Sequence, residues 1–218
     1  MSTRESQNDK YLRLSRYELD AARDGYSAVA GIDEAGRGPL AGPVVAAACI
    51  LDPAHPILGL DDSKKLSEKK REELYEQITR FARAFAVVRV EADIIDEVNI
   101  LEATKRAMRQ AVVNLAIQPD LLLIDAVQLS GTGIRTVPII KGDAQSNSIA
   151  AASILAKVTR DRILVEYDRQ YPGYGFAKHK GYGTREHYAA IAALSLTPIH
   201  RRSFLKNLAD HLSNMDDR

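Results

Sequence analysis

Two adjacent acids, Asp33 and Glu34, follow a short apolar segment and precede a glycine-arginine-glycine turn at 36–38. Carboxylates at the end of a buried strand need a partner, because an unpaired buried charge is unfavourable. A bound cation would supply that partner. A glycine-flanked arginine beside the acids is suited to a phosphate or a sugar. The stretch from 28 to 45 therefore indicates a cation site next to a phosphate- or sugar-binding turn.

Two further acids occupy positions of the same kind. Asp125 ends the apolar segment 121–124, and Asp143 follows a short segment at 136–140. Functional crevices of α/β sheets lie at strand ends, so these acids converge with the first pair if the two apolar strands are neighbours. Four carboxylates can share a site only by binding cations, and all-oxygen ligation favours Mg²⁺ or Mn²⁺ over zinc. Two such ions, about 3.5–4 Å apart, support phosphodiester displacement, which is the chemistry of nucleases.

Two local alternatives accompany this prediction. Consecutive residues of a strand point to opposite faces, so Asp33 and Glu34 reach one site only if the strand ends or bends there. Gly36 and Gly38 make such a bend feasible. Asp143 lies near the start of a helix, where capping that helix is the competing role.

The elements that would position the acids alternate between strands and helices. Apolar periodicity and turn residues predict strands at 28–32, 43–51, 86–90, 121–125 and 136–140. They predict helices at 11–23, after Ser67 with apolar positions Leu74, Ile78, Phe81 and Phe85, at 99–117 and at 148–169. We expect loops at 52–63 and 171–183 and further helix after them. This alternation predicts an α/β fold with one mixed sheet flanked by helices.

We expect three parts in the chain: a helical appendage at 1–27, a catalytic domain at 28–170, and a helical, substrate-binding extension at 171–218. The single cysteine, Cys49, lies in an apolar run, so it is expected in the core, and no intrachain disulfide can form. The polar N-terminus lacks the apolar segment of a secretion signal. The longest apolar run, 43–51, is shorter than the roughly 20 residues that span a bilayer. We therefore expect a cytoplasmic protein without a membrane segment.

Charge is distributed unevenly along the chain. The formal net charge is +1, but residues 141–206 contain eleven Lys or Arg and five Asp or Glu. A basic C-terminal third fits a polyanionic partner. On charge alone, a solvated basic face is an equally good interpretation.

Six segments together resemble bacterial ribonuclease HII. They are GIDEAGRGPLAGP at 31–43, DSKKL at 62–66, LID at 123–125, KGD at 141–143, AASILAKV at 151–158 and HKGY at 179–182. The similarity runs from about residue 28 to residue 204, and the joint set of motifs is highly specific. The 27 preceding residues are too few for the extra substrate-binding domain of the related ribonuclease HIII.

The resemblance implies a ribonuclease H-like fold and an endonuclease for RNA–DNA hybrids and for single ribonucleotides embedded in duplex DNA. Cleavage would fall on the 5′ side of the ribonucleotide and leave 3′-hydroxyl and 5′-phosphate ends. Asp33, Glu34, Asp125 and Asp143 match the family's catalytic, metal-binding acids, which hold two Mg²⁺ or Mn²⁺ ions. The expected partner is the hybrid or ribonucleotide-containing duplex, the expected role is ribonucleotide excision repair, and we expect a monomer.

Substrate-binding residues follow from the same resemblance. Gly36, Arg37 and Gly38 match the motif that recognises the 2′-hydroxyl, the group that distinguishes RNA from DNA. Glycine also lets the backbone approach a sugar closely. Tyr182 matches the family's tyrosine that packs against the sugar at the junction, with an aromatic lid as the alternative.

Phosphate contacts are expected from residues that would position the duplex without specifying its sequence. These residues are Ser63, Lys64 and Lys65, and more weakly Lys178 and Lys180.

Three other functions compete with this interpretation. The sequence 36–41 fits the dinucleotide motif G-x-G-x-x-A, which requires a following helix, whereas Pro43 and Val44 favour a strand. A histidine-based ribonuclease would use His179 and His200 as general acid and base and would work without metal. A catalytically silent nucleic-acid-binding module would bind the duplex and leave it intact.

Overall fold

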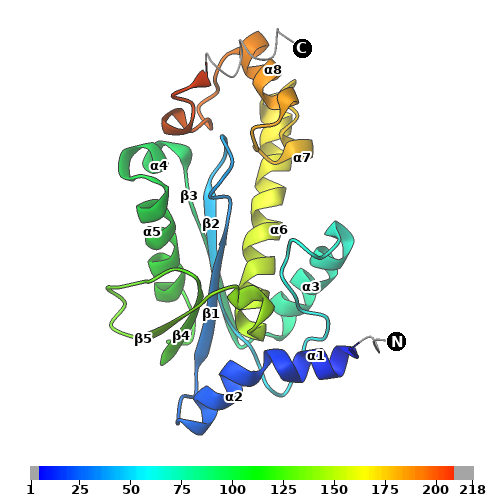
Figure 1. Ribbon diagram of the computed structural model, residues 1–218, viewed down its shortest axis with the longest axis vertical. Coiled ribbons are helices and arrows are strands. Elements are labelled where there is room, and N and C mark those ends of the chain that lie inside the picture. The colour runs from blue at the N-terminus through cyan, green and yellow to red at the C-terminus, as the bar shows by residue number, and fades with distance from the viewer. Residues whose placement is uncertain (1–4, 209–218) are drawn as a thin grey trace.

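The computed structural model describes residues 5–208, and within them a five-stranded mixed sheet forms the centre (Figure 1). The strands are β1 (Val29–Ala35), β2 (Val44–Ile50), β3 (Ala84–Val90), β4 (Leu121–Asp125) and β5 (Arg135–Ile139). Their order is β3-β2-β1-β4-β5, with β2 antiparallel to both β1 and β3 and with β4 parallel to β1 and β5. The predicted mixed α/β sheet is confirmed.

Helices cover both faces of this sheet, and shorter helices gather at its two ends (Figure 1). One face carries α3 (Glu68–Phe81) and α6 (Asn147–Gln170), and the other carries α4 (Ala92–Val98) and α5 (Ile100–Val113). The helices α1 (Gln7–Leu14) and α2 (Arg16–Arg23) lie at one end. At the other end are α7 (Phe176–His179), α8 (Arg185–Leu194) and the 3-10 turn η2 (Arg202–Phe204), and a second such turn, η1 (Gly142–Ala144), precedes α6. The predicted helical C-terminal region is therefore present.

Strand β2 is buried along its whole length because helices pack on both sides of it. Ala47 and Cys49 face the core beneath α3 and α6, whereas Ala46 and Ala48 face the core beneath α5. Burial raises the pKa of the Cys49 thiol to about 12. The expectation that this cysteine is a core residue is confirmed.

Close contact between β1 and α6 depends on Gly31. A Cβ atom at this position would lie 2.0 Å from the backbone carbonyl carbon of Ser148, which belongs to α6. The missing side chain lets the helix backbone rest directly on the strand. Asp33, two residues further along, therefore faces the same helix.

Several predicted boundaries were wrong, for reasons that lie in tertiary contacts. The helix expected at 11–23 is two helices, α1 and α2, that meet at Ser15. There the Ser15 hydroxyl donates to the Tyr11 carbonyl and accepts from the Asn147 amide of α6. Phe85 lies in β3 rather than in the preceding helix, because the chain becomes extended at Ala82.

Two short helices were not predicted. The helix α4 has seven residues and α7 has four, so both are shorter than the windows of about 11–18 residues in which helical periodicity is recognised. The strand expected at 28–32 continues to Ala35 and so contains both acids. No helix within residues 5–208 has the length and apolar character needed to cross a membrane.

Candidate active site

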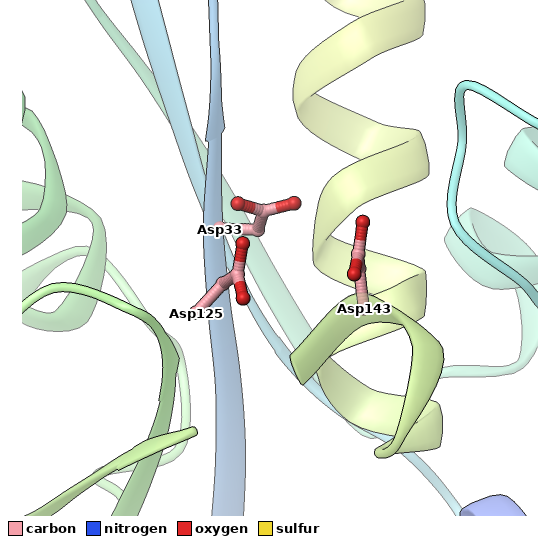
Figure 2. Close-up of side chains that lie close together, drawn as sticks. All are labelled: Asp33, Asp125 and Asp143. Atoms are coloured by element: carbon pink, nitrogen blue, oxygen red, sulfur yellow. The ribbon is translucent and has the colours of Figure 1, made fainter. Parts of the chain in front are cut away.

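Three of the four predicted acids come together at one edge of the sheet (Figure 2). Asp33 comes from β1, Asp125 from the last position of β4, and Asp143 from η1. Each offers one carboxylate oxygen, and these oxygens all lie within 4.8 Å of one another. They meet because β1 and β4 are parallel neighbours, which places their carboxyl ends at the same edge.

Unusual backbone conformations hold two of these acids in place. Ala126, next to Asp125, has φ 48°, and Lys141, two residues before Asp143, has φ 55°. Non-glycine residues in this region carry strain and concentrate at functional sites. The Gly142 amide donates to Asp125 Oδ1 at 2.6 Å and so orients that carboxylate.

Asp143 does not cap α6. The N-cap is Ser146, whose hydroxyl accepts from the Ile149 amide. The carboxylate of Asp143 is buried and faces Asp33 and Asp125 instead (Figure 2). The capping alternative raised by the sequence is therefore wrong.

Burial and nearby carboxylates raise the pKa values of two of these acids, Asp33 and Asp143. Burial holds the pKa of Asp33 well above its usual range, and the carboxylates of Glu34 and Asp125 raise it further, while the Ser153 hydroxyl opposes them. Burial likewise raises the pKa of Asp143 to about 6, with additional contributions from Asp62 and Asp125. Like charges this close require protons or cations, and an all-oxygen cluster fits a hard divalent cation.

Glu34 lies beside this group but is not one of the three clustered acids. Its Oε1 accepts from Arg37 Nη1 at 3.3 Å, and its Oε2 is buried without a hydrogen-bond partner among residues 5–208. Burial raises the pKa of Glu34, Arg37 lowers it, and Asp125 raises it again, which shows that Asp125 is near. An unpartnered buried carboxylate oxygen at this place fits a cation ligand, because such an atom is otherwise costly.

A cavity of about 250 Å³ adjoins Asp33 and Glu34. Its walls contain all six predicted substrate-binding residues, namely Gly36, Arg37, Gly38, Ser63, Lys64 and Tyr182. Three residues of α6 that the sequence analysis did not assign also line it: Ser153, Lys157 and Arg160. Their spacing of three to four residues places them on one helical face, which is the signal that could have identified them.

The glycine turn and Tyr182 form facing walls of the cavity. Gly36 has φ 96°, and a Cβ atom there would lie 2.1 Å from Nε of Arg160. Gly38 faces Tyr182, since its Cβ would lie 3.7 Å from Cε1 of the tyrosine ring. Gly36 therefore needs to be glycine for both conformation and space, whereas Gly38 leaves room between turn and ring.

Two buried arginines hold the glycine turn from behind. Arg160 and Arg201 are only 1% and 0% exposed, and neither ion-pairs with a carboxylate in the described part of the chain. Burial lowers their pKa values to about 10 and about 9. The acceptors are the carbonyls of Ala41, Pro43 and Lys180 for Arg160, and of Gly36, Arg37 and Gly42 for Arg201, at 2.6–3.0 Å. No pattern in the sequence indicates that these two basic residues are buried.

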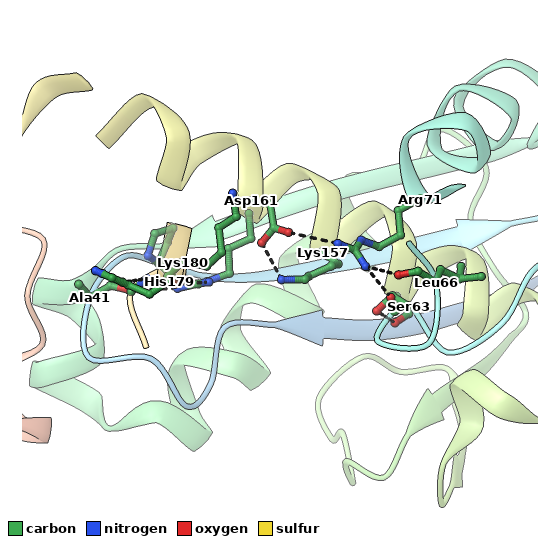
Figure 3. A network of polar contacts seen from close by, with 12 residues as sticks. Ala41, Ser63, Leu66, Arg71, Lys157, Asp161, His179 and Lys180 are labelled. Carbon is green, nitrogen blue, oxygen red and sulfur yellow. Dashed lines mark hydrogen bonds and ion pairs between the residues drawn. The ribbon is translucent and has the colours of Figure 1, made fainter. Parts of the chain in front are cut away.

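A second network fixes the Ser63 loop against α6 (Figure 3). Arg71 donates to the Ser63 carbonyl at 3.1 Å and forms an ion pair with Asp161 at 3.9 Å. Lys157 contacts the same Asp161 at 2.7 Å, and the Ser153 hydroxyl donates to the Ser63 hydroxyl at 2.9 Å. The loop is thereby held at the cavity.

The other predicted phosphate contacts lie outside that cavity. Lys65 is near Asp61 and Asp62, at 3.9 and 3.8 Å, and Lys178 pairs with Glu186 at 2.5 Å. Lys180 supplies its carbonyl to Arg160.

Two competing functions lose their structural basis. The glycine turn leads into β2, not into the helix that a dinucleotide motif requires. His179 and His200 are 8% and 2% exposed. The ring of His179 bonds to the Tyr174 carbonyl, and the ring of His200 bonds to His187 and to the Thr197 amide, not to the acids. Neither residue can serve as the general acid or base of a site at Asp33.

The sheet order, the covering helices and the acids at the ends of β1 and β4 define a metal-dependent nuclease with a ribonuclease H-like fold. The family model of ribonuclease HII matches residues 30–207. The chain therefore belongs to the ribonuclease HII family. It is an endoribonuclease that cleaves RNA in hybrids and at single ribonucleotides in duplex DNA, on the 5′ side, with 3′-hydroxyl and 5′-phosphate products.

Similar proteins support this assignment. Ribonuclease HII of Acetivibrio thermocellus is 56% identical over 203 residues, which cover 93% of this chain and 79% of the relative. The enzyme of Ruminiclostridium cellulolyticum is 54% identical over 202 residues, with the same coverage of 93% and 79%. The crystal structure of ribonuclease H2 from Pyrococcus horikoshii has a TM-score of 0.73 at 27% identity, covering 86% of this chain and 99% of that one. Ribonuclease HII of Archaeoglobus fulgidus, in a complex with PCNA, has a TM-score of 0.69 at 30% identity, covering 83% and 96%.

Proposed function

We propose that Asp33, Glu34, Asp125 and Asp143 together hold two Mg²⁺ or Mn²⁺ ions and form the catalytic centre. The observation that carries this proposal is the cluster of three mutually close carboxylates, with the unpartnered Glu34 Oε2 beside it. When bound, the ions supply an activated water and charge stabilisation for the leaving oxygen. Asp33 and Glu34 line the cavity and so place that chemistry beside it.

The cavity walls supply the recognition of ribose. Gly36, Arg37 and Gly38 present backbone next to the acids, and Tyr182 closes the opposite side. The Arg37–Glu34 contact at 3.3 Å joins the recognition turn to the proposed metal ligands. Ser63 and Lys64 lie at the same cavity and are suited to a phosphate.

The proposal extends to the organisation and setting of the enzyme. Residues 1–27 serve as an appendage, 28–170 as the catalytic domain, and 171–218, which contains Tyr182, as the substrate-binding extension. The enzyme works as a cytoplasmic monomer in ribonucleotide excision repair. The direct test is cleavage of a DNA duplex with one embedded ribonucleotide, with both product ends mapped. Cleavage on the 3′ side of the ribonucleotide would contradict the proposal.

Removal of divalent metal is expected to abolish cleavage. Enzyme that has been treated with EDTA and then passed through gel filtration should form no detectable cleavage product, because the acids alone provide no activated nucleophile. Addition of Mg²⁺ or Mn²⁺ should restore activity. A calorimetric titration of the protein with each ion gives the number of ions bound. Activity that survives in EDTA, or a stoichiometry of one, would overturn the two-ion proposal.

Replacement of Tyr182 by alanine is expected to lower kcat/KM about tenfold on the single-ribonucleotide duplex. Loss of ring packing on a nucleotide costs about 1–3 kcal/mol. The matched control is Tyr182→Phe, which retains the ring and should retain most activity. Equal activity of the alanine and phenylalanine variants would remove Tyr182 from the substrate site.

A further inference from the structure

Three histidines form a buried cluster beneath Tyr182, and nothing in the proposed chemistry uses them. His179, His187 and His200 are 8%, 0% and 2% exposed. His187 and His200 approach through their Nε2 atoms at 3.1 Å, and the rings of His179 and His187 stack with centroids 4.5 Å apart. The ring of Phe176 packs against all three.

The backbone donors around the cluster determine where each ring carries its proton. The Thr197 amide donates to Nδ1 of His200 at 2.9 Å, so that nitrogen is bare and Nε2 carries the hydrogen. This Nε2–H faces Nε2 of His187, which must accept it. The hydrogen of His187 is then on Nδ1, which lies 2.9 Å from the Tyr182 carbonyl oxygen. The result is a directed hydrogen-bond chain from Thr197 through two neutral imidazoles to Tyr182.

His179 completes the support of the same turn. The Gly181 amide donates to its Nδ1 at 3.2 Å, so its Nε2–H donates to the Tyr174 carbonyl at 2.7 Å. The backbone amide of Tyr182 donates to the His179 carbonyl at 3.0 Å. Both backbone polar groups of Tyr182 are thus bonded to this cluster.

The fixed backbone of Tyr182 has a direct consequence for its side chain. The ring is 47% exposed and lines the cavity opposite Gly38. The neighbouring Gly181 carbonyl accepts from the Leu40 amide at 2.8 Å, which ties this turn to the glycine turn. The backbone of Tyr182 therefore determines where its ring points.

We propose that His187 and His200 are positioning residues that, as a pair of neutral imidazoles, hold the Tyr182 carbonyl and thereby aim the Tyr182 ring at the substrate. This inference rests on the proposed role of Tyr182 in substrate binding. Protonation of either ring breaks the chain, because it sets a donor against a donor at His187 Nε2 or at His200 Nδ1.

The environment of the pair keeps it neutral. Burial lowers the pKa of each of the two histidines to about 4, and the nearby His179 lowers both further, while the hydrogen bond of His187 to the Tyr182 carbonyl opposes the lowering at His187. The titratable groups that face the rings are His179, stacked on His187, and Tyr174, whose ring centroid is 5.4 Å from that of His200. Because the unfolded chain binds these protons near pH 6.5 and the folded chain only near pH 4, stability is lost as the pH falls through this window.

A matched pair of variants tests the proposal. His187→Asn retains an N–H near the position of Nδ1. In His187→Leu the side chain has nearly the same shape and size as asparagine but no hydrogen-bond donor. Both lose the ring equally. We expect His187→Leu to raise KM for the single-ribonucleotide duplex about tenfold relative to His187→Asn with little change in kcat, since one hydrogen bond contributes about 0.5–1.5 kcal/mol. Equal KM values for the two variants would overturn the inference.

A double-mutant cycle separates this inference from the proposed function. In a Tyr182→Ala background, the difference between His187→Leu and His187→Asn should vanish, because the ring they position is gone. A difference that persists there would show a general structural role and contradict the proposal. If Tyr182→Ala alone leaves KM unchanged, the role of Tyr182 fails instead.

Wild-type enzyme provides a test that does not depend on variants folding. Long-range ¹H–¹⁵N correlation spectra distinguish the two neutral tautomers of each histidine. We expect the Nδ1–H form for His187 and the Nε2–H form for His200, retained at pH 6. The opposite tautomer at either ring, or a charged imidazolium at that pH, would overturn the inference.

Discussion

Asp125→Asn is expected to lower kcat by at least about 10³-fold, equivalent to about 4 kcal/mol of transition-state stabilisation. The asparagine carbonyl can still accept the hydrogen bond from the Gly142 amide, so the local structure at the end of β4 is retained. The substitution removes one negative charge from a cluster whose oxygens lie within 4.8 Å of one another. The loss should therefore fall on metal binding and chemistry.

The same substitution should not destabilise the metal-free protein. Burial and, in addition, the Asp125 carboxylate raise the pKa values of Asp33 and Asp143, so removal of the Asp125 charge relieves repulsion. In EDTA, the melting temperature of Asp125→Asn should equal or exceed that of the wild type. Calorimetry and a cleavage assay on one preparation measure both effects, and Asp24→Asn, at an exposed aspartate, is the control. A variant that keeps a tenth of wild-type kcat would remove Asp125 from the catalytic centre.

The convergence of the acids could be predicted from the sequence because it depends on where the strands end. An apolar run that stops at Asp125 predicts the end of β4, and parallel pairing with β1 then places Asp33 nearby. The position of Glu34 was harder to predict, because strand periodicity turns its side chain away from that of Asp33 and the sequence does not show the local twist of the strand. The structure leaves Glu34 beside the cluster, with one oxygen that has no partner in the described part of the chain.

The residues that support the site were much harder to predict from the sequence. In the sequence, Arg160 and Arg201 look like ordinary surface cations in a basic region. Only the fold shows that both are buried and that they donate to six backbone carbonyls. The helix α4 was missed for a related reason. Its Asp96 accepts from the amides of Arg202 and Ser203, a contact between residues about 106 positions apart that no local pattern reveals.

Gly31→Ala is expected to destabilise the protein by at least about 3 kcal/mol, at the upper end of overpacking effects. The added Cβ would lie 2.0 Å from the Ser148 carbonyl carbon and 2.2 Å from the Ile149 amide nitrogen. Both are backbone atoms of α6, so no side-chain rotation can relieve the clash. For a chain of this length, the melting temperature should fall by about 6–12 °C.

Gly38→Ala is the matched control for that prediction. Its Cβ would make an ordinary contact of 3.7 Å with the Tyr182 ring, so its melting temperature should stay close to that of the wild type. Gly31→Ala should also lose activity well below its own melting temperature. Relief of the clash requires α6 to move away from β1, and this separates Ser153 and Lys157 on the helix from Asp33 on the strand. A Gly31→Ala protein with wild-type melting temperature and activity would show that α6 can shift without cost, and that close packing of this helix on β1 does not set the geometry of the site.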